Sequence, residues 1–211
     1  MSEILRTIAS KLYQGEDTEV SALVQQALNA QLTAQEILAN GLIAGMNNVG
    51  RDFKTGDLYV PEVLCAARAM HAGMNLLRPL LSVSDIPTAG KCVIGTVKGD
   101  LHDIGKNLVR MMLEGAGFET IDLGVDVKTE TFVAAVREHK PELLGMSALL
   151  TTTMVEMKST LAALDQAGLR QSVRVMVGGA PVTSGYASQI GADAFAPDAA
   201  TAVEIARRLV G

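Results

Sequence analysis

The sequence predicts a four-helix bundle at residues 1–82 and an α/β domain with a five-stranded parallel sheet at residues 91–211, joined by a linker at 83–90. Residues before the linker carry apolar side chains at helical spacing and show no strand pattern. The linker contains Ser, Pro, Thr and Gly, which interrupt this spacing. Beyond it, short apolar runs alternate with helical segments, which is typical of a parallel sheet covered by helices on both faces.

Start signals divide the first domain into four helices. A first helix is expected near residues 4–12, and Asp17 or Thr18 is placed to cap the second. The segment Thr-Ala-Gln-Glu at 33–36 is a capping box that opens the third helix. Pro61 suits the first position of a fourth helix that runs to about residue 81. Four helices with short connections predict a small bundle.

Five apolar runs organise the second domain. Five strand–helix units of this spacing predict a Rossmann-like (flavodoxin-like) parallel sheet. We expect strands at 92–97, 119–123, 143–147, 173–177 and 193–196, and helices near 103–115, 129–139, 153–167, 183–190 and 199–209.

The composition indicates a globular protein. Hydrophobic residues make up 48% of the 211 residues, and the net charge of −5 without a basic stripe argues against a nucleic-acid partner. No apolar run approaches the roughly 20 residues that cross a bilayer, and the N-terminus shows no secretory signal. Cys65 and Cys92 lie in apolar sequence and are expected to be reduced, buried thiols. We therefore expect a cytoplasmic protein with no membrane partner.

A loop that contains His102 follows the first expected strand, at the strand end where α/β sheets bind ligands. We call residues 97–103 the histidine loop. Asp100 and His102 are two residues apart, so the carboxylate can reach the imidazole, as carboxylates do behind metal-ligating histidines. Gly99 and Gly105 flank the pair and leave room for a large ligand against the backbone. A single loop histidine is more often structural or simply exposed, but this arrangement between a strand and a helix favours a ligand site.

Three further strand ends could add walls to the same site. Residues 147–153 are rich in Ser and Thr, which can hydrogen bond into a cleft or can simply cap the next helix. Gly178 and Gly179 permit close approach of a flat ligand, or form an ordinary turn. Residues 195–199 could close the groove, although this segment alone is a weak signal.

These motifs together resemble a known family. Asp100-Leu101-His102-Asp103-Ile104-Gly105 is similar to the Asp-x-His-x-x-Gly signature of cobalamin-binding modules that hold the corrinoid base-off/His-on. Ser147-x-Leu149 and the pair Gly178–Gly179 are similar to that family's Ser-x-Leu and Gly-Gly signatures, in the same order. The resemblance covers nearly the whole chain.

The resemblance implies a set of roles. The cofactor's dimethylbenzimidazole is displaced, and His102 becomes the lower axial ligand of cobalt. Asp100 and Thr153 join His102 in a hydrogen-bonded triad. Methionine synthase-like modules have a serine at the position of Thr153, and threonine adds a methyl group there. The nucleotide tail passes Ser147, Thr151, Gly178, Gly179 and Ala199. The implied cofactor-binding residues in this domain are Gly99, Asp100, Leu101, His102, Asp103, Ile104, Gly105, Ser147, Leu149, Thr151, Thr153, Gly178, Gly179 and Ala199.

The helical domain resembles the cap that precedes the cobalamin domain in methyltransferases, through residues 45–53 and 56–64. By this resemblance Phe53, Val60 and Val63 cover the upper face of the cofactor, where the methyl group lies. An apolar cover would exclude water from the reactive metal. Unaided, each of the three residues would be assigned to the core of the bundle.

The function implied is a methyl-carrying corrinoid protein of a multi-component methyltransferase system, similar to the corrinoid proteins for methylamines, methanol and O-demethylation. Such a protein cycles between methylcobalamin and cob(I)alamin and is not a stand-alone enzyme. Its partners are a substrate-specific methyltransferase, an acceptor methyltransferase that delivers to tetrahydrofolate or a thiol, and a reductive activator protein.

Three alternatives stay open. A cobalamin-dependent sensor or regulator and the small subunit of an adenosylcobalamin isomerase use the same histidine motif. A flavodoxin-like interaction domain could bind nothing at all. Dinucleotide, P-loop and serine-hydrolase motifs are absent from the sequence. His71 and His139 also lack partners at metal-ligand spacing.

Overall fold

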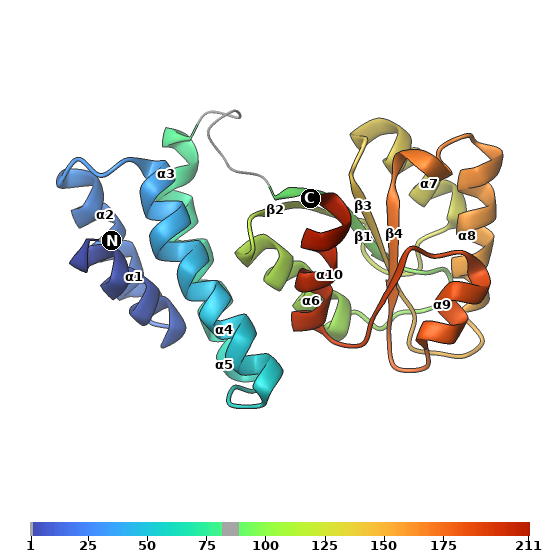
Figure 1. The fold of residues 1–211 in the computed structure, drawn as a ribbon, viewed down its shortest axis with the longest axis horizontal. Helices are drawn as coiled ribbons and strands as arrows, with labels where there is room; N and C mark the ends of the chain where they lie inside the picture. The colour runs from blue at the N-terminus through green and yellow to red at the C-terminus, as the bar shows by residue number, and fades with distance from the viewer. Residues whose placement is uncertain (1, 82–88) are drawn as a thin grey trace. The chain divides into compact units, whose positions relative to one another are not determined.

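The computed structural model describes residues 2–81 and 89–211, and the chain forms two compact units, one helical and one built on a sheet. The predicted helical domain and the predicted five-stranded parallel sheet are both confirmed (Figure 1). Residues 83–88, most of the predicted linker, lie outside the described residues. No helix within the described ranges is long and apolar enough to cross a membrane.

The helical unit is an apolar bundle whose third helix contains a π turn. Thr33 and Glu36 form the predicted capping box at the start of this third helix. The centre of the bundle holds fully buried side chains, including Ile8, Leu12 and Leu42. The elements are α1 (Glu3–Tyr13), α2 (Asp17–Asn29), α3 (Ala34–Ile37), the π-helical η1 (Leu38–Ile43), α4 (Ala44–Thr55), α5 (Val60–Leu77) and the 3-10 helix η2 (Arg78–Leu80).

Two helix starts differ from the prediction. The N-cap of α2 is Glu16, not Asp17 or Thr18, and its side chain accepts no capping hydrogen bond from the described residues. Asp17 instead begins the helix, where its carboxylate accepts the Thr18 N–H at 2.8 Å. Helix α5 begins one residue before Pro61 and ends earlier than expected, because η2 tightens its last turn. Element ends depend on local hydrogen bonds that apolar spacing does not report.

The sheet unit has strand order β2-β1-β3-β4-β5 with all strands parallel, the flavodoxin-like order. Helices α7, α8 and α9 cover one face of the sheet, and α6 and α10 cover the other (Figure 1). The strands are β1 (Gly90–Thr96), β2 (Phe118–Asp122), β3 (Leu143–Ser147), β4 (Arg174–Gly178) and β5 (Ala194–Ala196), and the helices are α6 (Ile104–Gly115), α7 (Thr129–His139), α8 (Val155–Gln166), α9 (Ser184–Ile190) and α10 (Ala199–Val210).

The strands read as continuous apolar runs because both faces of the sheet are covered. Val93, Leu144 and Val175 are fully buried against α7 and α8. Cys92 is also fully buried, and burial raises the pKa of its thiol to about 12. The expectation of a buried thiol is therefore confirmed for Cys92, whereas Cys65 is only half-buried.

Candidate functional site

The histidine loop leaves β1 through a tight turn. The Asp100 N–H donates to the Val97 carbonyl at 3.1 Å, and Gly99 has a φ of +80° at the third position of this turn. That conformation is strained for residues other than glycine, so the sequence requires Gly99 here. The turn directs Asp100 inward, between the ends of β1 and β3, where the strand order of the sheet reverses. This switch point is where flavodoxin-like sheets bind ligands.

Asp100 is a fully buried carboxylate that joins two loops. One oxygen accepts the backbone N–H of His102 at 3.1 Å and lies 2.7 Å from Nδ1 of its ring. The other oxygen accepts the N–H groups of Leu149 at 2.7 Å and Leu150 at 3.3 Å, and the Thr153 hydroxyl at 2.8 Å. The loop after β1 and the loop after β3 are therefore fixed to each other through one side chain.

The hydrogen bonds keep Asp100 ionised despite its burial. Burial alone would raise the pKa of this carboxyl, but the bonds from the Leu149 amide, His102 and Thr153 outweigh it and hold the pKa well below its usual range. An ionised carboxylate can only accept hydrogen bonds, so the proton between the two groups lies on Nδ1 of His102. The lone pair of the neutral ring is then on Nε2.

The His102 side chain is 51% exposed, so a ligand can approach it from solvent. The predicted contact between Asp100 and His102 is present, and Thr153 completes the predicted triad with its hydroxyl. The carbonyl of His102 is held as well, because it accepts the Thr96 hydroxyl at 2.9 Å. The site thus offers one oriented imidazole, whose Nε2 has no hydrogen-bond partner among the described residues.

Several large apolar side chains are exposed to solvent on the segments around this imidazole. Leu101 is 72% exposed and Ile104 is 80% exposed, on either side of His102. Clustered exposed apolar residues mark binding surfaces, since their contact with water is unfavourable. The remaining members come from the loops after β2 and β3 and the start of α8, and they are Val125, Leu149, Leu150 and Val155.

The opposite end of the same sheet edge is made of small residues. Ser147 at the end of β3 pairs with Gly178 at the end of β4. Gly179 follows with a φ of +121° and packs directly against the Ala148 backbone, where a Cβ would collide with the carbonyl oxygen. Ala199 is buried at the start of α10, after β5. The structure thus places the three predicted strand ends along one edge of the sheet.

Other predicted residues lie on the surface of the loops. Thr151 is exposed in the loop after β3. Asp103 is exposed, and its carboxylate accepts the Asn107 amide at 3.0 Å across the first turn of α6. Gly105 is exposed, and a Cβ built there would meet open space. These positions leave the surface beside His102 accessible.

The predicted cover residues lie in the helical unit. Phe53 in α4 and Val60 at the start of α5 are half-buried, whereas Val63 is fully buried. Their assignment to the upper face of a ligand stays a prediction.

Sequence reasoning missed an ion pair between a buried lysine and a partly exposed carboxylate. Lys106 in the first turns of α6 is buried, and its ammonium donates to both carboxylate oxygens of Asp122, at 2.6 and 2.7 Å. Burial opposes ionisation of Asp122, but Lys106 and the Gly124 N–H hold the pKa of that carboxyl below its usual range. The sequence did carry a signal for the burial of Lys106. It lies seven residues before the buried Leu113, and so on the same face of α6.

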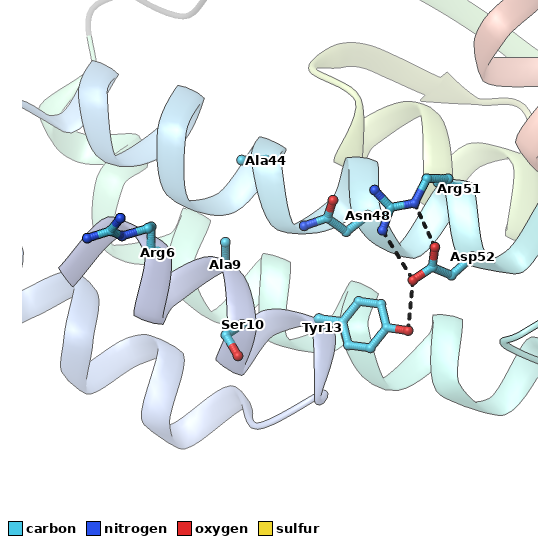
Figure 2. A pocket seen from close by; sticks show the side chains of 8 residues that line it. All are labelled: Arg6, Ala9, Ser10, Tyr13, Ala44, Asn48, Arg51 and Asp52. Carbon is cyan, nitrogen blue, oxygen red and sulfur yellow. Dashed lines mark hydrogen bonds and ion pairs between the residues drawn. The ribbon is translucent and has the colours of Figure 1, made fainter. Parts of the chain in front are cut away.

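A hollow lies in the helical unit, between α1 and α4 (Figure 2). Asp52 of α4 bridges the two helices, because it accepts the hydroxyl of Tyr13 in α1 at 3.0 Å. It also accepts the guanidinium of its neighbour Arg51 at 2.7 Å. The other residues that line this hollow are Arg6, Ala9, Ser10, Ala44 and Asn48. The polar groups in this hollow are mostly exposed or satisfied by one another, so the sheet edge is the stronger candidate site.

The fold and this edge define a flavodoxin-like ligand-binding protein with an N-terminal helical domain, in which a buried carboxylate orients one exposed imidazole. Comparison with known proteins then gives the family. A B12 binding domain family matches residues 90–207, and a second B12 binding domain family matches residues 4–78. The chain belongs to the B12-binding corrinoid proteins, and its cofactor is cobalamin.

The curated relatives are named corrinoid proteins, and one solved structure that matches is a methyltransferase complex. Trimethylamine corrinoid protein 1 of Methanosarcina acetivorans is 43% identical over 197 residues, covering 92% of this chain and 91% of the relative. Dimethylamine corrinoid protein 1 of the same organism is 42% identical over 209 residues, covering 99% and 98%. A chain in the methanol:cobalamin methyltransferase complex of Methanosarcina barkeri superposes with a TM-score of 0.91 at 32% identity, covering 99% of this chain and 80% of that one. The predicted family and cofactor are confirmed, and the protein is a corrinoid protein of a methyltransferase system.

Proposed function

We propose that this chain holds cobalamin base-off/His-on, with Nε2 of His102 as the lower axial ligand, and carries a methyl group between two methyltransferases. The observation that carries the proposal is the hydrogen bond from Nδ1 of His102 to the buried Asp100, which leaves Nε2 free on an exposed ring. A carboxylate bonded behind an imidazole fixes its orientation and strengthens it as a metal ligand. When bound, the cobalt supplies the methyl-accepting and methyl-donating centre, which protein side chains do not offer.

The residues at the sheet edge fit a corrinoid. His102 offers one nitrogen donor, which suits a metal whose ring already supplies its equatorial ligands. Leu101 and Ile104 offer apolar surface to a large flat ring, and burying that surface would favour binding by roughly 25 cal/mol per Å². The small residues support the proposed path of the displaced nucleotide tail, past Ser147, Thr151, Gly178, Gly179 and Ala199.

Asp100 and Thr153 act on His102 in this proposal. Asp100 holds the ring proton on Nδ1, and the Thr153 hydroxyl satisfies the second carboxylate oxygen. The Thr153 oxygen also lies 2.9 Å from the Leu150 carbonyl oxygen of the same turn, so the hydroxyl is held within the loop after β3. The pair keeps the imidazole oriented so that Nε2 faces away from the carboxylate.

We assign residues 1–82 to a cap and residues 91–211 to the cobalamin-binding domain, which agrees with the ranges that the two family matches cover. In the cap, Phe53 and Val60 would shield the upper face of the ring from water, and the buried Val63 would support them from the bundle core. Such a cover must open for a partner enzyme to reach the methyl group.

The proposed partners are a donor methyltransferase, an acceptor methyltransferase that delivers to tetrahydrofolate or a thiol, and a reductive activator. The relatives' names, which pair corrinoid proteins with trimethylamine, dimethylamine and methanol, support this role over a sensor or an isomerase subunit. The sites that choose donor and acceptor would then lie on the partner enzymes.

The test is methyl transfer in a reconstituted system. The chain is loaded with hydroxocobalamin, reduced, and mixed with a labelled methylamine, methanol, betaine or methoxyaromatic compound, each with and without its methyltransferase. We expect label on the chain only with a matching enzyme, followed by its loss when acceptor and acceptor methyltransferase are added. Label that reaches the acceptor equally well without the chain would contradict the proposal.

A further inference from the structure

The loop after β2, residues 123–128, is fastened to the histidine loop through Asp126. The Asp126 carboxylate accepts the Gly99 N–H at 2.7 Å, and the Asp126 N–H donates to the Asp100 carbonyl at 2.9 Å. Asp126 therefore holds the backbone of two consecutive residues, Gly99 and Asp100, shortly before His102. No sequence motif pointed to this contact, because the partners are 27 residues apart.

Asp126 adopts a backbone conformation that demands an explanation. Its φ is +52°, in the left-handed region that residues other than glycine seldom occupy, although Asp and Asn tolerate it best. Its side chain is exposed, so packing into the core does not account for the conformation. What the conformation achieves is to bring both the N–H and the carboxylate of Asp126 onto the turn at Gly99 and Asp100. Strained residues of this kind gather at functional sites.

The neighbours of Asp126 tie the same two loops together. The Thr96 N–H donates to the Gly124 carbonyl at 3.0 Å, and the Val127 N–H donates to the Thr96 carbonyl at 3.0 Å. Thr96 in turn donates its hydroxyl to the His102 carbonyl at 2.9 Å. The loop after β2 thus supports the histidine loop from the side opposite to the loop after β3.

We propose that Asp126 is a positioning residue for the metal ligand: its two hydrogen bonds fix the turn at Gly99 and Asp100, and so fix the direction in which His102 presents Nε2. This inference rests on the proposed His-on binding of cobalamin. Asp100 orients the ring within the turn, and Asp126 orients the turn within the domain. Asp100 joins this turn to the loop after β3, and Asp126 joins it to the loop after β2, so the turn is held from both sides.

Substitutions at this position separate the hydrogen bond from the backbone and the charge. Asp126→Gly removes the carboxylate but adopts the positive φ without strain. Asp126→Asn retains an acceptor oxygen and tolerates the same φ, while it removes the charge. If the hydrogen bond matters, Asp126→Asn should behave like the wild type and Asp126→Gly should not.

The first readout needs no cofactor. Amide hydrogen exchange of the apo protein should be about tenfold faster at Gly99 in Asp126→Gly than in the wild type, the loss expected for a hydrogen bond to a charged acceptor. In Asp126→Asn it should stay within about threefold of the wild-type rate. Equal Gly99 exchange in Asp126→Gly and wild type would overturn the inference.

The second readout is metal ligation. Each protein is loaded with cobalamin and reduced to the paramagnetic cobalt(II) state, and electron paramagnetic resonance measures the fraction with histidine nitrogen on cobalt. We expect the ratio of ligated to unligated cobalt to fall about tenfold in Asp126→Gly and to be restored in Asp126→Asn. A ratio unchanged in Asp126→Gly, or equally reduced in Asp126→Asn, would overturn the role of this hydrogen bond. A wild type without histidine on cobalt would instead refute the proposed His-on function itself.

Discussion

The two ends of the sheet edge are built on opposite principles. Where β1 and β3 end, a buried carboxylate accepts several hydrogen bonds and orients an imidazole. The ligand site there depends on hydrogen bonds between polar groups. Where β4 and β5 end, Gly178, Gly179 and Ala199 contribute small volume and close backbone contacts. The end at β1 and β3 depends on the hydrogen bonds of its side chains, and the end at β4 and β5 depends on its residues being small. Substitutions should therefore harm the two ends by different mechanisms.

The largest effect is expected at the small-residue end. Gly179→Ala should lower the free energy of unfolding by about 4 kcal/mol, because it combines strain at a φ of +121° with a collision against the Ala148 carbonyl. Urea unfolding of the apo protein measures this change. Gly191→Ala is the matched control, since Gly191 has a φ of +81° with open space around a new Cβ, and it should cost only about 1 kcal/mol. Equal costs for the two variants would remove close packing as the reason for Gly179.

At the polar end, Asp100→Ala should lower the free energy of unfolding by about 3 kcal/mol. The change leaves the Leu149 N–H and the Thr153 hydroxyl without their buried acceptor. Asp100→Asn keeps one acceptor oxygen but places an amide NH2 against donor groups that the second oxygen accepted in the wild type. It should lower the free energy of unfolding by about half as much as Asp100→Ala. Denaturant titration of the three proteins tests the order, and an alanine variant as stable as the wild type would show that the buried network contributes little.

The polar end also predicts a dependence on acid. The pKa of Asp100 is lower in the folded protein than in the unfolded chain, so the unfolded chain binds a proton first as the pH falls. Stability from this carboxylate is complete above about pH 4 and is lost below it, with a slope of up to about 1.4 kcal/mol per pH unit. The free-energy difference between the wild type and Asp100→Asn should therefore shrink between about pH 4 and pH 2. A difference that stays constant over this range would contradict the depressed pKa.

The smallest effect should come from Thr153. Thr153→Ser retains the hydroxyl that donates to Asp100, so unfolding free energy should change by less than about 1 kcal/mol. Thr153→Val keeps the shape and removes the donor, and it should cost about 1.5 kcal/mol. If the valine variant matched the serine variant in stability, the hydroxyl of Thr153 would have no structural part in the triad.

The sequence predicted those features that are local along the chain. Buried parallel strands are continuous apolar runs, so all five were placed within a few residues. The contact between Asp100 and His102 followed from their spacing within one loop. The contacts of Asp126 with Gly99 and of Lys106 with Asp122 were missed, because strand pairing brings them together. The π turn η1 was also missed, since its apolar spacing continues that of the flanking helices.

The account depends most directly on one bond, between the ring nitrogen of His102 and cobalt. Protein in which every histidine carries the heavy stable isotope of nitrogen can be loaded with unlabelled cobalamin and reduced to cobalt(II). We expect the nitrogen splitting in the electron paramagnetic resonance spectrum to change from a triplet to a doublet, because the heavy isotope has nuclear spin one half, and to disappear in His102→Ala. A triplet that persists in the labelled protein would show that the cofactor's own base remains on the metal, and it would contradict the proposed site.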